Sequence, residues 1–72
     1  MNNITEGWVI QRSDGKFLKG IRKYTDEEHY VKDVLSDITR RPTKDLIENI
    51  ITNYELQNCK PVKVKIEVVA DE

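Results

Sequence analysis

The sequence contains few of the residues that stabilise very small proteins or build chemical sites in them. A single cysteine excludes an intrachain disulfide. With one histidine beside it, a structural zinc site would need carboxylates or a second chain. The three glycines at positions 7, 15 and 20 are too scattered to form a phosphate-binding loop. The sequence therefore predicts no metal and no cofactor.

Excess charge and long apolar runs are also missing. The formal net charge is −1, so the chain as a whole does not attract nucleic acid or an anionic membrane. No apolar run approaches the roughly 18 residues of a membrane span. Residues 1–6 have neither the basic region nor the apolar core of a signal peptide. We therefore expect a cytoplasmic protein without a membrane partner, and a single cysteine agrees with a reducing compartment.

The composition is that of a folded chain with a thin core. Seventy-two residues allow one domain, predicted to span residues 1–72. Leu, Ile, Val and Phe make up about 28% of the chain, above the roughly 20% below which disorder is expected. Charged residues make up 35%, against about 25% in a typical domain. Small domains usually add a disulfide, a metal or a second subunit, so the sequence predicts a homodimer.

The clearest local signal is a β-hairpin predicted over residues 7–22. Asp14-Gly15 lies between two β-prone runs, and both central residues of a type I′ turn need the positive φ that this pair accepts. A two-residue turn brings the larger apolar set to one face of the hairpin, and we favour it for that reason. This set consists of Trp8, Ile10, Phe17 and Ile21.

A second register of the hairpin is open. A three-residue loop over residues 13–15, a type I turn with a glycine bulge, would put Leu18 rather than Phe17 on the side of Trp8. The choice decides which residues reach the core. Residues 1–6, which precede the hairpin, are predicted to be a polar, frayed tail.

Two helices are predicted after the hairpin, over residues 25–39 and 43–57. Thr25 can cap the first helix, because Glu28 lies at the capping-box position. Thr43 can cap the second, which should end near Gln57-Asn58. The apolar stripes behind these predictions are Val31, Val34, Leu35 and Ile38 in the first helix, and Leu46, Ile47, Ile50, Ile51 and Tyr54 in the second.

A final strand is predicted over residues 61–69, where Val and Ile alternate with charged residues. The expected order is β-β-α-α-β, a small α+β domain with a three-stranded sheet and two helices packed on one face. The lysine-bearing face of the last strand would remain in solvent. An open sheet edge rich in Val and Ile would suit pairing with a second subunit.

The residues most suited to chemistry have no evident partners. His29 is interpreted as a surface histidine, and Cys59, which precedes Lys60, as an incidental thiol. The acidic residues of the first predicted helix lack the spacing of a calcium loop and are interpreted as stabilising its N-terminus. They are Asp26, Glu27, Glu28 and Asp33. We expect no catalytic residues, and a site for an enzyme would have to be assembled across a dimer interface.

Nucleic-acid binding rests on the basic residues of the hairpin, which number five within twelve residues. They are Arg12, Lys16, Lys19, Arg22 and Lys23. Aromatic residues among them could stack on bases, but Trp8 and Phe17 point into the core in the favoured register. We favour the view that the charges protect sheet edges. They would gain functional meaning if Arg12 and Lys19 shared one exposed side with Arg22 or with the second basic pair, Arg40-Arg41.

The run from Trp8 to Gly20, followed by Tyr24-Thr25-Asp26 and a closing Val/Lys strand, resembles many small uncharacterised proteins of bacteriophages and prophages of Gram-positive bacteria. The resemblance implies a phage-encoded protein that acts by binding a host or phage protein, and it implies no catalytic or binding residues. We therefore expect a small non-enzymatic protein-interaction module, with nucleic-acid binding through the basic hairpin as the alternative.

Overall fold

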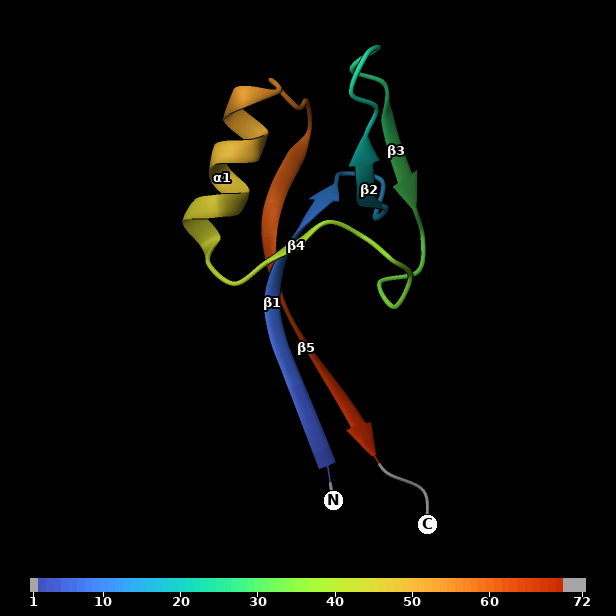
Figure 1. Cartoon of the computed structure of the whole chain (residues 1–72), viewed down its shortest axis with the longest axis vertical. Helices are drawn as coiled ribbons and strands as arrows, with labels where there is room; N and C mark the ends of the chain where they lie inside the picture. The colour runs from blue at the N-terminus through green and yellow to red at the C-terminus, as the bar shows by residue number, and fades with distance from the viewer. Residues whose placement is uncertain (1, 70–72) are drawn as a thin grey trace.

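The chain forms a small α+β domain with a five-stranded antiparallel sheet and one helix (Figure 1). The computed structural model describes residues 2–69, and the side chains of residues 6–65. The elements are β1 (Asn2–Arg12), β2 (Phe17–Ile21), β3 (Glu28–Val31), β4 (Arg40–Arg41), α1 (Lys44–Asn53) and β5 (Cys59–Val69). The expected class is therefore confirmed, but the predicted three strands and two helices are wrong.

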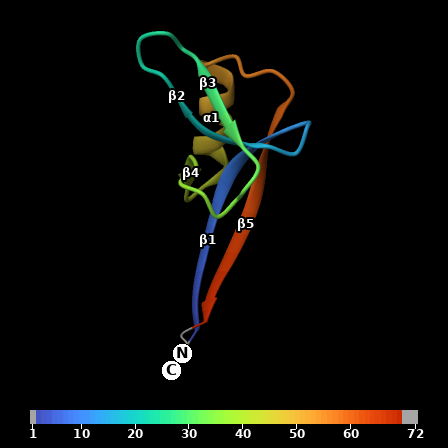
Figure 2. The ribbon, with the colours of Figure 1, turned by 90° about the vertical axis from the view of Figure 1, so that its right-hand side faces the viewer.

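Strand β1 organises the sheet. Along one edge it pairs with β5 from Asn2↔Val69 to Arg12↔Cys59. Along the other edge it pairs with β4 and then β2, and β3 lies outside β2. The β1–β5 ribbon extends well beyond the other elements as a two-stranded arm (Figures 1 and 2). Residues 2–6, predicted as a frayed tail, belong to this arm because β5 supplies their hydrogen-bonding partners, and residue 1 lies outside the described residues.

The hairpin between β1 and β2 adopts the three-residue register, so the preferred two-residue register is wrong. Gln11 is opposite Phe17, and the Arg12 amide donates to the Lys16 carbonyl at 2.8 Å. Gly15 has a φ of 89°, and its amide donates to the Arg12 carbonyl at 2.9 Å. The Asp14 carboxylate also accepts a hydrogen bond from the Lys16 amide, and this bond stabilises the three-residue loop.

The register selects the core. Leu18, which is 1% exposed, takes the place that the two-residue turn assigned to Phe17. It packs with Ile10, Ile47 and Leu56, and these four residues form the central cluster. Trp8 and Ile21, both predicted in the core, are partly buried against this cluster. The helix face of the sheet therefore depends on a few aliphatic side chains from β1, β2 and α1.

The segment predicted as a helix over 25–39 contains turns and one short strand, β3. The Arg22 amide donates to the Glu27 carbonyl and the Asp26 amide to the Arg22 carbonyl, both at 2.9 Å, which closes a tight turn between β2 and β3. Tyr30 then pairs with Leu18. The helical prediction failed because pairing with β2 satisfies the backbone groups of residues 28–31, and this tertiary contact overrides the local helical spacing.

The loop between β3 and β4 covers the face of β1 that α1 does not. In Figure 1 this loop and α1 lie on opposite sides of β1. Val9 is 0% exposed and Ile38, near the end of the loop, is 8% exposed. Both faces of the central part of β1 are therefore covered.

Helix α1 begins after Thr43, as predicted, but ends at Asn53 rather than near Gln57-Asn58. Glu55 adopts a positive φ of 51°, and the Leu56 amide donates back to the Ile51 carbonyl at 3.0 Å. This early ending turns Leu56 into the core, where it is 6% exposed. Within residues 2–69, no helix has the length and apolar character needed to cross a membrane.

The hairpin loop makes the stability of the folded protein depend on pH in the acid range. The Arg12 guanidinium donates to the Asp14 carboxylate at 2.7 Å, and this bond, with the Lys16 amide, lowers the pKa of Asp14 to about 2. The pKa of Asp14 in the folded protein is lower than its ordinary value of 3.8. The ionised Asp14 carboxylate therefore stabilises the folded state fully above pH 3.8, and this stabilisation is lost as the pH falls toward 2. We expect ¹³C NMR of the folded protein to give a carboxyl midpoint near pH 2.

The matched control for this titration is Arg12→Gln. It should move the Asp14 midpoint upward while leaving the bond from the Lys16 amide in place. An ordinary midpoint in the unaltered protein would show that the Arg12–Asp14 contact does not persist in solution.

Candidate functional site

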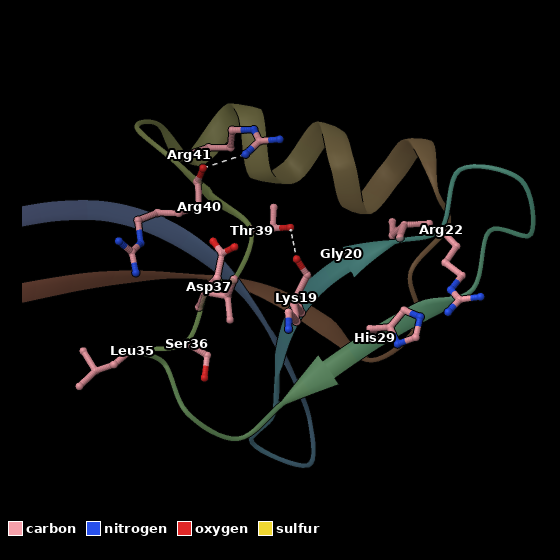
Figure 3. Close-up of a pocket in the computed structure, with 12 residues that line it drawn as sticks. Lys19, Gly20, Arg22, His29, Leu35, Ser36, Asp37, Thr39, Arg40 and Arg41 are labelled. Atoms are coloured by element: carbon pink, nitrogen blue, oxygen red, sulfur yellow. Dashed lines mark hydrogen bonds between the residues drawn. The ribbon is translucent and has the colours of Figure 1, made fainter.

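A concave surface of about 940 Å³ lies between β2, the start of β3 and the segment that leads into β4 (Figure 3). We call it the basic concavity, because most of the charged side chains that line it are cationic. These charged and titratable residues are Lys19, Arg22, His29, Asp37, Arg40 and Arg41. Among the described residues of its lining, Asp37 is the one carboxylate, so the local charge differs in sign from the net charge of the chain.

Hydrogen bonds from Thr39 hold the two walls of the concavity together. Its hydroxyl donates to the Lys19 carbonyl at 3.0 Å, and its amide donates to the Leu18 carbonyl at 3.1 Å. The first of these bonds is drawn in Figure 3. The neighbouring Ile38 side chain is buried and anchors the same segment. Residues twenty positions apart in the sequence therefore present their side chains to one surface.

Arg40 and Arg41 leave β4 in different directions. Arg41 pairs with Trp8 and Arg40 with Val9, so the two arginines lie on opposite faces of the sheet. The Arg41 guanidinium turns toward α1 and donates to the Arg40 carbonyl at 2.8 Å (Figure 3). Arg40 extends from the face that bears Lys19. We therefore count Arg40 among the cations of the concavity, with Arg41 at its rim.

Arg40 is placed by close packing against β1. A Cβ added to Gly7 would lie 2.9 Å from Arg40 Cγ, 3.1 Å from its Cδ and 3.3 Å from the Arg41 carbonyl oxygen. The Arg40 Nε is buried and has no hydrogen-bond partner among the described atoms. The stem of Arg40 thus lies across Gly7, and its guanidinium lies at one end of the concavity (Figure 3).

This packing predicts a cost for a methyl group at position 7. We expect Gly7→Ala to lower the free energy of unfolding by about 1–3 kcal/mol, because the Arg40 stem or the β4 backbone must move. The control is Gly20→Ala, whose added Cβ meets nothing within 4 Å. It should be neutral or stabilising by up to about 1 kcal/mol. Equal urea midpoints for the two variants would contradict the packing of Arg40 on Gly7.

The cations form a row rather than a compact cluster. In Figure 3, Arg40 lies toward one end of the concavity, Lys19 near its middle, and Arg22 and His29 toward the other end. Arg22 also forms a long, exposed ion pair with Glu27 at 3.9 Å, and such pairs contribute little. A row of cations on an open surface, with Lys19 and Arg22 exposed and Arg40 half-buried, suits an extended anion better than a single small one.

The five basic residues predicted for nucleic-acid binding do not form one patch. Lys19 and Arg22 line the concavity, but Arg12 does not. Arg12 bonds Asp14 and stacks on the Tyr30 ring, 3.9 Å from the ring centroid. The remaining two lie in turns: Lys16 in the β1–β2 loop, and Lys23 in the β2–β3 loop. The prediction of a single patch from closeness in the sequence is wrong, because neighbouring side chains of a strand point to opposite faces of the sheet.

Arg40 and Arg41, noted in the sequence only as a second basic pair, join Lys19 and Arg22 at this surface. The condition stated for the basic residues is not met, because it required Arg12 beside Lys19; Lys19 shares the surface with Arg22 and the second basic pair instead. His29 was interpreted as a surface residue, and it is exposed but lines the same concavity. Sequence reasoning missed the contribution of the segment before β4. This segment reaches β2 through the hydrogen bonds of Thr39, and no local sequence pattern predicts that contact.

Cys59 belongs to a different environment. Its sulfur lies 3.4 Å from the Tyr30 hydroxyl and 3.2 Å from the Gln57 carbonyl oxygen. Burial, together with hydrogen bonds to Cys59 and Glu28, raises the pKa of Tyr30. His29 is adjacent to Tyr30 on β3 and therefore points to the other face. The structure does not bring the one histidine and the one cysteine together.

The acidic residues predicted on one helix are distributed over the β2–β3 turn, β3 and the loop after it. Within the described part of the chain, no group of three or more His, Cys, Asp or Glu side chains could hold a metal ion. Comparisons with protein-family models, with curated proteins and with solved structures gave no match to this chain. Functional inference therefore rests on the geometry of the basic concavity.

Proposed function

We propose that this protein is a non-enzymatic nucleic-acid-binding protein that contacts phosphates through the basic concavity. The observation that carries the proposal is the convergence of Lys19, Arg22 and Arg40, from β2, the following turn and β4, around one open surface. Convergence from separate elements distinguishes this surface from a run of charges along one strand. It supplies the local positive potential that the near-zero net charge conceals.

The types of side chain suit a phosphate backbone. Arginine guanidinium groups can donate two parallel hydrogen bonds to a phosphate, and lysine acts as a mobile point charge. Lys19 and Arg22 are exposed, so phosphates can reach them without removing a covering segment. The row that they form with Arg40 spans the concavity and suits several successive phosphates (Figure 3).

Titration with fluorescein-labelled oligonucleotides at 0.05 M and 0.2 M salt tests this function. Three phosphate contacts predict a slope of log K against log salt of about −2 to −3, because each contact releases condensed counterions. Fluorescence anisotropy with both single-stranded and duplex 15-mers measures the slope. Absence of binding to either probe at the lower salt concentration would overturn the proposal, since phosphate contacts are strongest there.

A second candidate is the protein-interaction module expected from the sequence, a homodimer joined through β5. Within residues 2–69, β1 is the one strand that pairs with β5, so eleven residues of β5 present an outer edge without a partner strand. A second copy could add its own β5 there. The resemblance to small phage proteins implies the binding of a host or phage protein, for which the same edge is available.

Features of the same edge place this candidate second. Pro61 removes one backbone donor, and the exposed Lys63 and Lys65 repel an incoming strand that carries the same charges. Light scattering at millimolar concentration separates the two candidates. A dimer with a concentration-dependent melting temperature would support edge pairing. A monomer with a melting temperature independent of concentration would contradict it.

A further inference from the structure

An exposed aromatic residue lies in the turn that follows Arg22, one of the lining residues of the basic concavity. Tyr24 is 93% exposed, which leaves its ring almost without packing against the domain. It lies in the turn between β2 and β3, two residues after Arg22, which lines the concavity. The Nζ of Lys23 lies 5.9 Å from the centroid of this ring. The ring is therefore available for stacking beside a cation that can hold a phosphate.

The turn that bears Tyr24 is closed by hydrogen bonds. The Arg22 amide donates to the Glu27 carbonyl, and the Asp26 amide donates back to the Arg22 carbonyl, both at 2.9 Å. The Glu27 amide also donates to the Thr25 hydroxyl at 3.4 Å. These bonds fix the path of the backbone on both sides of Tyr24. Its ring is thus carried by a defined loop that begins at the Arg22 end of the concavity.

From this arrangement we infer that the preferred ligand of the basic concavity is single-stranded nucleic acid, with one base stacked on Tyr24. The inference rests on the proposed function and adds that the nucleic acid is single-stranded. The backbone of the strand runs past Arg40, Lys19 and Arg22, and the base that follows Arg22 meets the tyrosine ring. In a duplex the bases are paired and stacked on one another, so none is free to cover an external ring.

The test compares Tyr24→Ala and Tyr24→Phe with the unaltered protein, using an oligo-dT 15-mer, a duplex of the same length and an abasic strand. We expect the oligo-dT to bind more tightly than the duplex. Tyr24→Ala should weaken oligo-dT binding by about 5- to 100-fold, the usual loss for one stacked base. Tyr24→Phe should bind almost normally, and binding of the abasic strand should be the same in all three proteins.

Tyr54→Ala is the matched control, because Tyr54 is an exposed tyrosine at the end of α1, 52% exposed. It should leave oligo-dT binding unchanged. Duplex binding as tight as oligo-dT binding, or an equal loss of abasic and oligo-dT binding in Tyr24→Ala, would overturn the single-strand inference and leave phosphate binding intact. Absence of binding to every probe by the unaltered protein would overturn the proposed function itself.

Discussion

Replacing Ile47 with alanine should lower the free energy of unfolding by about 2–5 kcal/mol. Ile47 is 0% exposed and is the buried residue of α1. It meets Ile10 and Leu18 in the central cluster, so its removal leaves a cavity lined by both strands of the hairpin. A chain of this size has a total stability near the lower end of the range for folded domains. The variant should therefore be largely unfolded at 37 °C.

Leu46→Ala is the control for this prediction. Leu46 is the preceding residue of the same helix and is 43% exposed, so its truncation removes little buried surface. We expect a change of less than about 1 kcal/mol in urea denaturation. Similar losses in the two variants would mean that α1 does not pack through Ile47.

Replacing Lys19, Arg22 and Arg40 together with glutamine should weaken oligonucleotide binding on the order of 100-fold at 0.05 M salt. Each lost phosphate contact removes about 0.7 from the slope of log K against log salt for a single strand, so the slope should fall by about 2. Glutamine keeps most of each side-chain stem, and Lys19 and Arg22 are exposed. The fold should therefore persist, which circular dichroism can verify.

A second triple variant makes the same change in net charge elsewhere. Lys44, Lys63 and Lys65 are exposed on α1 and β5, outside the concavity, and become glutamine in this control. It should lose less than about threefold in affinity, through the long-range field alone. Equal losses in the two triple variants would show that binding follows net charge rather than the concavity.

The parts of the fold that were predictable from the sequence have local causes. The stripe that includes Ile47 and Ile50 predicts α1 because no other element fits that spacing over three turns. The alternation of Val and Lys predicts β5. The segment around Tyr30 was misassigned because its helical spacing is only a local signal, and pairing with β2 overrode it.

The hairpin register and the concavity depended on contacts that local patterns do not contain. Two registers fit residues 13–15, and the Asp14 side chain, which bonds the Lys16 amide, favours the longer loop. Lys19 and Arg22 of the candidate site were anticipated, because they belong to the basic hairpin. Arg40 joins them through its pairing with Val9 of β1 and through the bonds of Thr39 to β2, which form between segments twenty residues apart.

The most direct test of the central claim is an NMR titration of ¹⁵N-labelled protein with an oligo-dT 15-mer at low salt. Binding at the basic concavity predicts amide shift changes in residues 19–22, 29 and 35–41, extending to Tyr24 in the adjoining turn. Amides of β5 and of the helix should change little. Shift changes concentrated on β5, or absent throughout while binding is saturated, would contradict the assignment of this surface.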